Sequence, residues 1–142
     1  MILLDTDHLS VLRFRSGERC SRLVARMEAA KDETFGTTIV NIAEQMKGWL
    51  AAINKERQAL RQVTAYSELA KLFDFYSCYH VALFDEAAAN RFNDLRKTKI
   101  RVGTTDLKIA AVALTSGALL LTANRQDFEK VPGLRLANWL DE

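Results

Sequence analysis

Stretches with strand character alternate with helical patterns along the whole chain, and this alternation constrains the fold most strongly. The strand-like stretches are residues 2–4, 34–37, 80–84, 118–121 and 134–139. Longer stretches with apolar residues at helical spacing lie between them, including 20–30, 39–50, 86–97 and 104–114. Such alternation favours a mostly parallel sheet with helices on both faces. We therefore expect an α/β fold whose last strand lies at an edge of the sheet.

Length and composition fit one globular domain. A chain of 142 residues can bury a core without disulfides or metals. A hydrophobic content of 49% with 27% charged residues excludes a disordered chain. Pro132 is the only proline and the glycines are scattered, so no linker is marked and we expect residues 1–142 to form a single domain.

Cysteine usage and the N-terminus predict a cytoplasmic protein. Cys20 and Cys78 lie far apart, without CxxC or paired-histidine spacing, so we expect reduced thiols. The first residues contain no basic segment followed by a long apolar one, which a signal peptide needs. All apolar runs are far shorter than a membrane span, so we expect no membrane contact.

Acidic residues stand where strands end and helices begin. Asp5 directly follows the first strand, and Glu44 lies in the helix after the second. Asp106 falls in the first turn of a helix that Thr104 or Thr105 is expected to cap. In a parallel sheet these three acids can meet at one edge. Taken singly, neither acid indicates a site. The helix dipole alone accounts for an aspartate at position 106, and Glu44 is also consistent with a solvated residue at the edge of the apolar stripe.

Other polar residues are expected to cap helices. Thr6 or Asp7 suits the helix after the first strand, while Thr38 and Asp85 precede two later helices. We interpret His8 as a partly buried or solvated side chain, because one histidine without partners is a weak ligand signal.

Two helical patterns in the middle of the chain predict a hairpin that projects from the sheet. The first carries an apolar stripe of Ile39, Ile42, Ala43, Met46 and Leu50. The second is expected to begin at the polar residues 54–57 and carries Leu60, Val63, Leu69, Leu72 and Phe73, with Tyr66 and Tyr76 nearby. Such a stripe suits a core or a partner surface better than a cofactor site.

The chemistry expected of converging acids is metal-assisted hydrolysis. Several carboxylates in one cleft repel one another unless something compensates their charge. Oxygen ligands without a cysteine or histidine set select a hard cation such as Mg²⁺ or Mn²⁺. Such a cation activates water and stabilises phosphoryl oxygens, so we expect phosphodiester hydrolysis without a covalent intermediate. The loop after the fourth strand adds Thr122, Asn124 and Asp127.

Five segments together resemble the PIN-domain ribonucleases, and among them the VapC-type toxins of bacterial toxin–antitoxin pairs. They are residues 3–10, the helix containing Glu44, residues 103–111, residues 121–128 and the ending 131–139. Each motif alone is weak, but the ordered set covers nearly the whole chain. The resemblance implies a three-layer PIN-like α/β domain, with a mostly parallel central sheet flanked by helices.

The resemblance also implies roles for the acids. Asp5 and Asp106 match the metal-binding aspartates, and Glu44 matches a central glutamate that holds metal or positions water. Asn124 stands where the family often has a fourth acid. Asp127 is left to replace that acid directly or through water, or only to cap a turn. The pattern thus implies one firmly bound Mg²⁺, replaceable by Mn²⁺, and leaves a second metal open. The auxiliary residues are Thr6, Thr122 and Asn124.

Basic residues lie beside the acid motifs in the sequence. They are Arg13, Arg15, Lys97, Lys99, Arg101, Lys108 and Arg125. Any one alone is explained as solvated surface charge, since the net charge is only +2, whereas the set suits the phosphates of a folded RNA. The resemblance suggests tRNA or ribosomal RNA as substrate. It also suggests a small antitoxin that inserts an arginine among the acids and lays a helix on apolar surface, and a homodimer.

Two alternatives stay open. Asp5, Thr6 and Asp7 imitate the motif of haloacid-dehalogenase-type phosphatases, which use the first aspartate as a nucleophile. Those enzymes need a later acidic pair, but the chain contains no Asp-Asp pair, and Leu9 stands where Thr or Val is usual. The other alternative is a catalytically decayed PIN-like binding module, which the neutral Asn124 allows.

Overall fold

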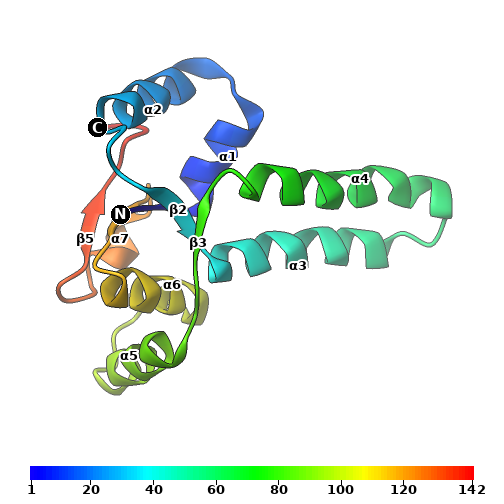
Figure 1. Cartoon of the computed structure of the whole chain (residues 1–142). Coiled ribbons are helices and arrows are strands. Elements are labelled where there is room, and N and C mark those ends of the chain that lie inside the picture. Colours follow the sequence, from blue (N-terminus) through cyan, green and yellow to red (C-terminus); the bar gives the residue numbers. More distant parts are fainter.

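A five-stranded, fully parallel sheet forms the centre of the protein in this computed structural model, which describes residues 1–142 (Figure 1). Its strands are β1 (Ile2–Leu4), β2 (Phe35–Thr38), β3 (His80–Ala82), β4 (Leu119–Leu121) and β5 (Arg135–Ala137). They are arranged in the order β3-β2-β1-β4-β5, and every neighbouring pair is parallel. The expected edge position of the last strand is therefore confirmed, and β1 lies at the centre.

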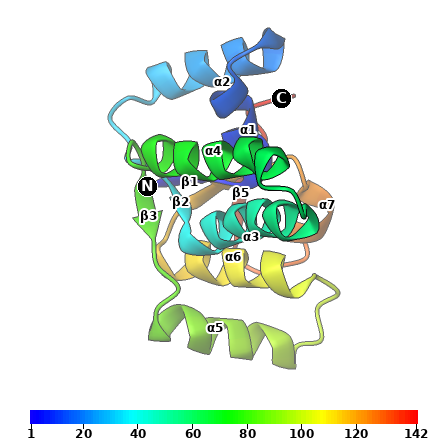
Figure 2. The ribbon, with the colours of Figure 1, turned by 90° about the vertical axis from the view of Figure 1, so that its right-hand side faces the viewer.

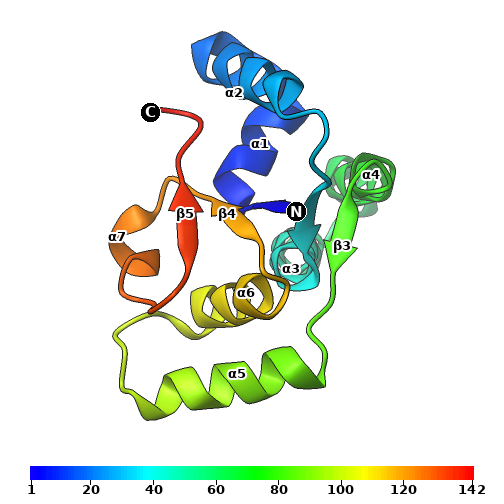
Figure 3. The same cartoon turned by 60° about the vertical axis from the view of Figure 1, so that its left-hand side comes forward.

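Seven helices form the layers on either side of the sheet. They are α1 (Thr6–Phe14), α2 (Gly17–Ala29), α3 (Ile39–Lys55), α4 (Ala59–Tyr76), α5 (Glu86–Lys97), α6 (Thr104–Thr115) and α7 (Arg125–Phe128). Figures 2 and 3 show α1 and α2 on one side of the sheet, with α5 and α6 on the other. The α/β fold with three layers is confirmed.

The central strand explains how one sheet supports two cores. Successive side chains of a strand point to opposite faces. Leu3 accordingly packs in one apolar cluster with residues of α5, α6 and α7, such as Phe92 and Phe128. Ile2 and Leu4 pack in the other cluster, with residues of α1, α2 and the α3–α4 hairpin. All three side chains of β1 are buried, so β1 joins both cores.

Two expected helix caps were wrong and two are confirmed. Asp5 caps α1, because its side chain accepts a hydrogen bond from the Thr6 backbone, in place of the expected Thr6 or Asp7. Gly103 precedes α6 and forms no side-chain cap, so Thr104 and Thr105 already lie in the helix. The caps by Thr38 and Asp85 are confirmed: Thr38 accepts from the Asn41 amide at 3.1 Å, and Asp85 accepts from the Ala88 amide at 2.9 Å.

The predicted hairpin is present, and it projects from the sheet (Figure 1). Its first helix continues to Lys55, so the polar residues 54–57 do not start the second helix as expected. The buried face of α3 also differs from the predicted stripe, since Ile39, Ala43 and Leu50 are exposed. The inward side is formed instead by Ile42, Met46, Trp49 and Ile53, at spacings of four, three and four.

The second helix of the hairpin has two apolar sides. Leu72 and Tyr76 are buried against the body of the protein. A separate set of large apolar residues stays in solvent, with exposed fractions of 88%, 56%, 55% and 61% for Leu60, Val63, Tyr66 and Phe73. We call these four residues the outer face of α4. No helix of this structure combines the length and apolar character that crossing a bilayer demands.

Gly36 allows β2 and β3 to pair, and replacing it should destabilise the sheet. A Cβ atom at Gly36 would lie 2.3 Å from the His80 carbonyl oxygen, so Gly36→Ala must push the two strands apart. We expect a loss of about 1–3 kcal/mol or more in the free energy of unfolding, measured by chemical denaturation. Gly48→Ala is the matched control, because a Cβ at Gly48 in α3 meets nothing within 4 Å. It should stabilise the protein by about 1 kcal/mol, since alanine is the better helix former. A Gly36→Ala variant as stable as the wild type would contradict this account of the strand pairing.

Candidate active site

Asp5 lies at the junction of the central strand and the first helix. Its backbone N–H donates to the Leu121 carbonyl at 2.9 Å and so extends the pairing of β1 with β4. Its side chain is only 8% exposed. Oδ1 accepts from the Thr6 amide at 2.9 Å and from Asn41 Nδ2 at 2.8 Å, while Oδ2 accepts from Thr122 Oγ1 at 2.8 Å. These bonds fix the orientation of the carboxylate.

The three acids singled out from the sequence surround one cavity. Asp106 comes from the first turn of α6 and Glu44 from the second turn of α3, and Thr105 Oγ1 lies 3.5 Å from Glu44 Oε1. The cavity has a volume of about 410 Å³. It is lined by Asp5, Thr6, Asp7, Asn41, Glu44, Gln45, Thr105, Asp106 and Ile109. Residues separated by about a hundred positions of chain therefore come together at the carboxyl ends of the strands.

Burial and neighbouring carboxylates raise the pKa of Asp5 and of Asp106. Burial raises the pKa of Asp106, and the charges of Asp5, Asp127, Asp7 and Glu44 raise it further. Burial and the charge of Asp7 also raise the pKa of Asp5, although its hydrogen bonds act in the opposite direction. Both shifts go in the direction expected for carboxylates that are buried beside other carboxylates.

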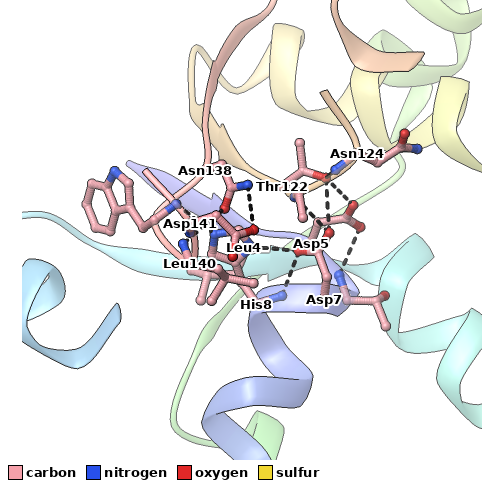
Figure 4. Close-up of polar contacts among 12 residues, drawn as sticks. Leu4, Asp5, Asp7, His8, Thr122, Asn124, Asn138, Leu140 and Asp141 are labelled. Carbon is pink, nitrogen blue, oxygen red and sulfur yellow. Dashed lines mark hydrogen bonds and ion pairs between the residues drawn. The ribbon is translucent and has the colours of Figure 1, made fainter. Parts of the chain in front are cut away.

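Asp7, which was expected only to cap a helix, also lines the cavity. Its Oδ2 accepts from the Ala123 backbone N–H at 2.8 Å, and its Oδ1 lies 2.6 Å from His8 Nδ1 (Figure 4). Burial alone would raise the pKa of Asp7, but the hydrogen bonds from His8 and Ala123 outweigh it and the pKa is lowered. The sequence signal was available, since Asp7 follows the strand end two residues after Asp5.

Asn41 was also missed. It is 1% exposed, and its amide nitrogen donates to Asp5 and, at 3.2 Å, to Thr6 Oγ1. Its Oδ1 accepts from Thr38 Oγ1 at 2.7 Å. A polar residue among apolar ones, three positions after the cap Thr38, was the signal for a buried structural amide. Asn41 joins α3 to the acid cavity.

The loop after β4 brings Thr122 and Asn124 beside the acids. Thr122 Oγ1 donates to Asp5 and accepts from the Asn124 backbone N–H at 3.0 Å (Figure 4). Asn124 Nδ2 lies 3.4 Å from Asp106 Oδ2 and 3.3 Å from Asp127 Oδ2. A neutral amide therefore bridges two carboxylates. Asp127 does not line the cavity, and it also lies 3.5 Å from Lys130 Nζ.

None of the seven basic residues that lie beside the acid motifs in the sequence lines the cavity. Arg13 pairs with Glu68 of α4, and its guanidinium lies 6.0 Å from the Trp49 ring. Arg125 pairs with Glu129 and Glu142, and Lys108 Nζ lies over the rings of Phe84 and Phe92. These three cations bind partners within the protein. The other four basic residues are exposed and form no ion pair. They are Arg15, Lys97, Lys99 and Arg101.

The donor set of the cavity fits a hard divalent cation. Its charged and amide groups offer oxygen, which Mg²⁺ and Mn²⁺ prefer. Burial and neighbouring carboxylates raise the pKa of Asp5 and Asp106, and a bound cation would act in the opposite direction. No three acidic, histidine or cysteine side chains lie close enough together in this structure to hold a metal ion by themselves, so a cation bound here would take the rest of its ligands from water or substrate. An open set of this kind suits a cation that keeps several of its waters.

Removing the carboxylate of Asp106 should stabilise the protein at neutral pH. Its pKa is raised above 3.8 in the folded state, so between the unfolded and folded pKa values the folded protein binds more protons. The free energy of unfolding therefore falls as pH rises through that window. In metal-free buffer we expect Asp106→Asn to raise Tm by a few degrees at neutral pH, with the gap closing as the pH approaches 3.8. Thermal melting at several pH values measures this.

Asp94→Asn is the control for this experiment, since Asp94 is exposed on α5 and lies outside the cavity. Its Tm should follow that of the wild type at every pH. A lower Tm for Asp106→Asn at neutral pH would show that the carboxylates do not repel one another in the folded protein.

Comparison with known proteins finds sequence similarity to ribonucleases and a similar fold in toxin–antitoxin complexes. Ribonuclease VapC1 of Rickettsia felis is 48% identical over 48 residues, which are 34% of this chain and 36% of that protein. A tRNA(fMet)-specific endonuclease VapC of Shigella flexneri is 36% identical over 75 residues, 50% of this chain and 57% of that protein. The matches thus span less than two thirds of the length of these relatives.

Solved structures match the fold over the full length. VapBC2 from Rickettsia felis, bound to a DNA fragment from its promoter, has a TM-score of 0.73 at 24% identity and covers 98% of this chain and 99% of that one. A toxin–antitoxin complex from Klebsiella pneumoniae has a TM-score of 0.66 at 19% identity, with 98% of each chain covered. The model of the PIN domain family matches residues 2–134 and leaves the phosphatase alternative without support. Because that match includes the strand ends and helices that form the acid cavity, the chain belongs to the PIN domain family.

Proposed function

We propose that this chain is a metal-dependent endoribonuclease toxin of the VapC type, which hydrolyses phosphodiester bonds in folded RNA. The convergence of Asp5, Glu44 and Asp106 on one cavity is the observation that carries the proposal. Membership of the PIN family supports it, as does similarity to relatives named as a ribonuclease and a tRNA(fMet)-specific endonuclease. We propose tRNA or ribosomal RNA as the substrate.

Asp5, Asp106 and Glu44 are the residues that would hold a divalent cation, with Mg²⁺ preferred and Mn²⁺ able to replace it. Such a cation lowers the pKa of bound water and stabilises charge on phosphoryl oxygens. Asp5 enters this role in a fixed orientation, because Asn41 and Thr122 hold both its oxygens. Glu44 is exposed at the cavity and is free to orient the attacking water and accept its proton.

Asn124 favours a single firmly held cation. Its neutral amide occupies the place between Asp106 and Asp127 where a further carboxylate would complete a second site. Asp127 is then left to act through water or only through its charge on Asp106. The same departure keeps the decayed binding module as the second candidate, which the cleavage experiment below tests.

The exposed cations beside α6 are suited to bind RNA phosphates. Lys97, Lys99 and Arg101 follow one another at the end of α5 and in the connection that leads to Asp106. Phosphate contacts of this kind weaken as salt rises. Arg15 lies on the other layer and is a candidate for a separate contact.

A small antitoxin and a second copy of this chain are the proposed protein partners. The toxin–antitoxin complex from Klebsiella pneumoniae shares this fold, which supports an antitoxin. An arginine inserted by the proposed antitoxin would compensate the negative charges of Asp5 and Asp106. We assign the homodimer contact to the outer face of α4. We also propose that residues 1–142 act as one domain in the cytoplasm, where thiols such as Cys20 and Cys78 stay reduced.

Asp5→Asn should abolish cation-dependent cleavage without unfolding the protein. The substitution keeps the shape of the side chain and removes the carboxylate of Asp5. Burial already raises the pKa of that carboxyl group. We expect cleavage of tRNA in Mg²⁺ to fall by at least roughly 100-fold, since even partners of metal ligands are worth 10–100-fold. Gel analysis of RNA fragments with sequencing of their ends measures it.

Asp32→Asn is the matched control, because Asp32 is exposed and precedes β2, at the amino-terminal ends of the strands and away from the cavity. EDTA should stop wild-type cleavage and Mn²⁺ should restore it. Wild-type protein that binds the cation but cleaves no RNA would support the decayed binding module. Unchanged cleavage by Asp5→Asn would rule out this cavity as the active site.

The outer face of α4 should mediate dimer formation. Light scattering coupled to size exclusion should give twice the chain mass of 16.0 kDa at micromolar concentration. Val63→Glu and Phe73→Glu place charge on exposed apolar residues and should produce monomers. Thr64→Glu adds the same charge to an exposed residue outside the apolar set and should leave the dimer intact. A wild-type monomer would reject this contact.

A further inference from the structure

His8 is fully buried and has one polar partner on each ring nitrogen (Figure 4). Nδ1 lies 2.6 Å from Asp7 Oδ1. Nε2 accepts from the Trp139 backbone N–H at 3.1 Å. The ring thus connects the acid cavity to a segment 131 residues away in the chain.

These contacts determine which ring nitrogen carries the proton. A backbone N–H can only donate, so Nε2 must accept from Trp139 and carries no proton. Nδ1 then carries the proton of a neutral imidazole and donates it to the carboxylate of Asp7. In the opposite tautomer, Nε2–H and the Trp139 N–H would point at each other. Nδ1 and the Asp7 carboxylate would then both be acceptors, so neither contact would be a hydrogen bond.

Both oxygens of the Asp7 carboxylate accept hydrogen bonds within the protein. Oδ1 accepts from the His8 ring and from the His8 backbone N–H at 2.7 Å. Oδ2 accepts from the Ala123 backbone N–H at 2.8 Å. Asp7 lines the cavity and also ties the first turn of α1 to the loop after β4.

That loop in turn orients Asp5. Thr122 donates to Asp5 Oδ2 at 2.8 Å and accepts from the Asn124 backbone N–H at 3.0 Å. A displacement of Asp7 would release Ala123, and with it the hydroxyl that holds Asp5. The contacts form one continuous path from Trp139 through His8, Asp7 and the loop to Asp5.

The partner of His8 is itself firmly placed. Asn138 Oδ1 accepts from the Leu140 backbone N–H at 3.0 Å, and Arg22 of α2 donates to the Leu140 carbonyl. The guanidinium of Arg26 lies 5.0 Å from the Trp139 ring. The end of the chain is thus held against α2 and presents a fixed donor to His8.

We propose that His8 is a positioning residue of the acid cavity, which holds Asp7 through Nδ1–H and so fixes the loop that orients Asp5. The effect on a bound cation rests on the proposed function, whereas the hydrogen-bonding role does not. Burial would otherwise raise the pKa of Asp7, and the hydrogen bond from His8 is the largest influence that lowers it.

The tautomer can be measured without cation or RNA. Long-range ¹H–¹⁵N correlation spectra of the labelled protein should show His8 with a protonated Nδ1 and an unprotonated Nε2. His80, the other histidine, is exposed on β3 and provides the comparison within the same spectrum. A His8 ring protonated on Nε2 alone would overturn the proposal.

Two substitutions separate the two contacts of His8. The amide nitrogen of asparagine lies near the position of Nδ1, so His8→Asn retains a donor to Asp7 and loses the acceptor for Trp139. The longer glutamine reaches the position of Nε2, so His8→Gln retains the acceptor and loses the donor. His80→Gln is the control for the same exchange at an exposed site.

Titration with Mn²⁺, followed by electron paramagnetic resonance of the free ion, reports the effect on the cavity. We expect His8→Gln to weaken Mn²⁺ binding roughly 10-fold or more, as loss of a partner behind metal ligands commonly does. His8→Asn should recover most of that affinity at a similar Tm. Equal weakening in both variants, or greater weakening in His8→Asn, would overturn the proposal. Wild-type protein that binds no Mn²⁺ would refute the proposed metal chemistry, and the tautomer spectrum would still decide the role of His8.

Discussion

The hydrogen bonds around Asp5 are the interaction on which the rest of the structure depends. This one residue continues the pairing of β1 with β4, caps α1, and accepts from side chains of α3 and of the loop after β4. Four segments are therefore placed relative to one another by the end of the central strand. Because the strands are all parallel, the same edge of the sheet also receives the helix starts that carry the other acids.

This arrangement concentrates negative charge that the fold does not compensate. The pKa values of Asp5 and Asp106 are raised, first by burial and then by neighbouring carboxylates. Natural proteins tolerate such destabilising features where activity requires them. Asp7 differs from the other two, since hydrogen bonds keep its pKa low and connect it to the scaffold. The cavity thus separates acids that remain available from one that maintains the geometry.

The hairpin divides its apolar residues between the core and the solvent. One side of α3 and α4 completes the core above β1, whereas the outer face of α4 leaves large apolar side chains in solvent. Arg13 strengthens the inner side by linking α1 to Glu68 of α4. A cation adjacent to an acid motif in the sequence therefore forms an ion pair within the protein.

Periodicity and capping in the sequence by themselves determined the α/β class, the five strands, the edge position of the last strand and the caps by Thr38 and Asp85. They also singled out the three acids that gather at the cavity, because strand ends and helix starts are local features. Their roles in catalysis stay a prediction. The predicted inward face of α3 was right for Ile42 and Met46 but wrong for Ile39, Ala43 and Leu50, because burial of a stripe depends on where the neighbouring helices pack. Only the tertiary structure decided that His8 contacts Trp139, that Asp7 and Asn41 support the cavity, and that Arg125 and Lys108 bind partners elsewhere. These contacts join segments far apart in the chain, and local sequence patterns contain no information about which distant groups packing will bring within hydrogen-bonding distance.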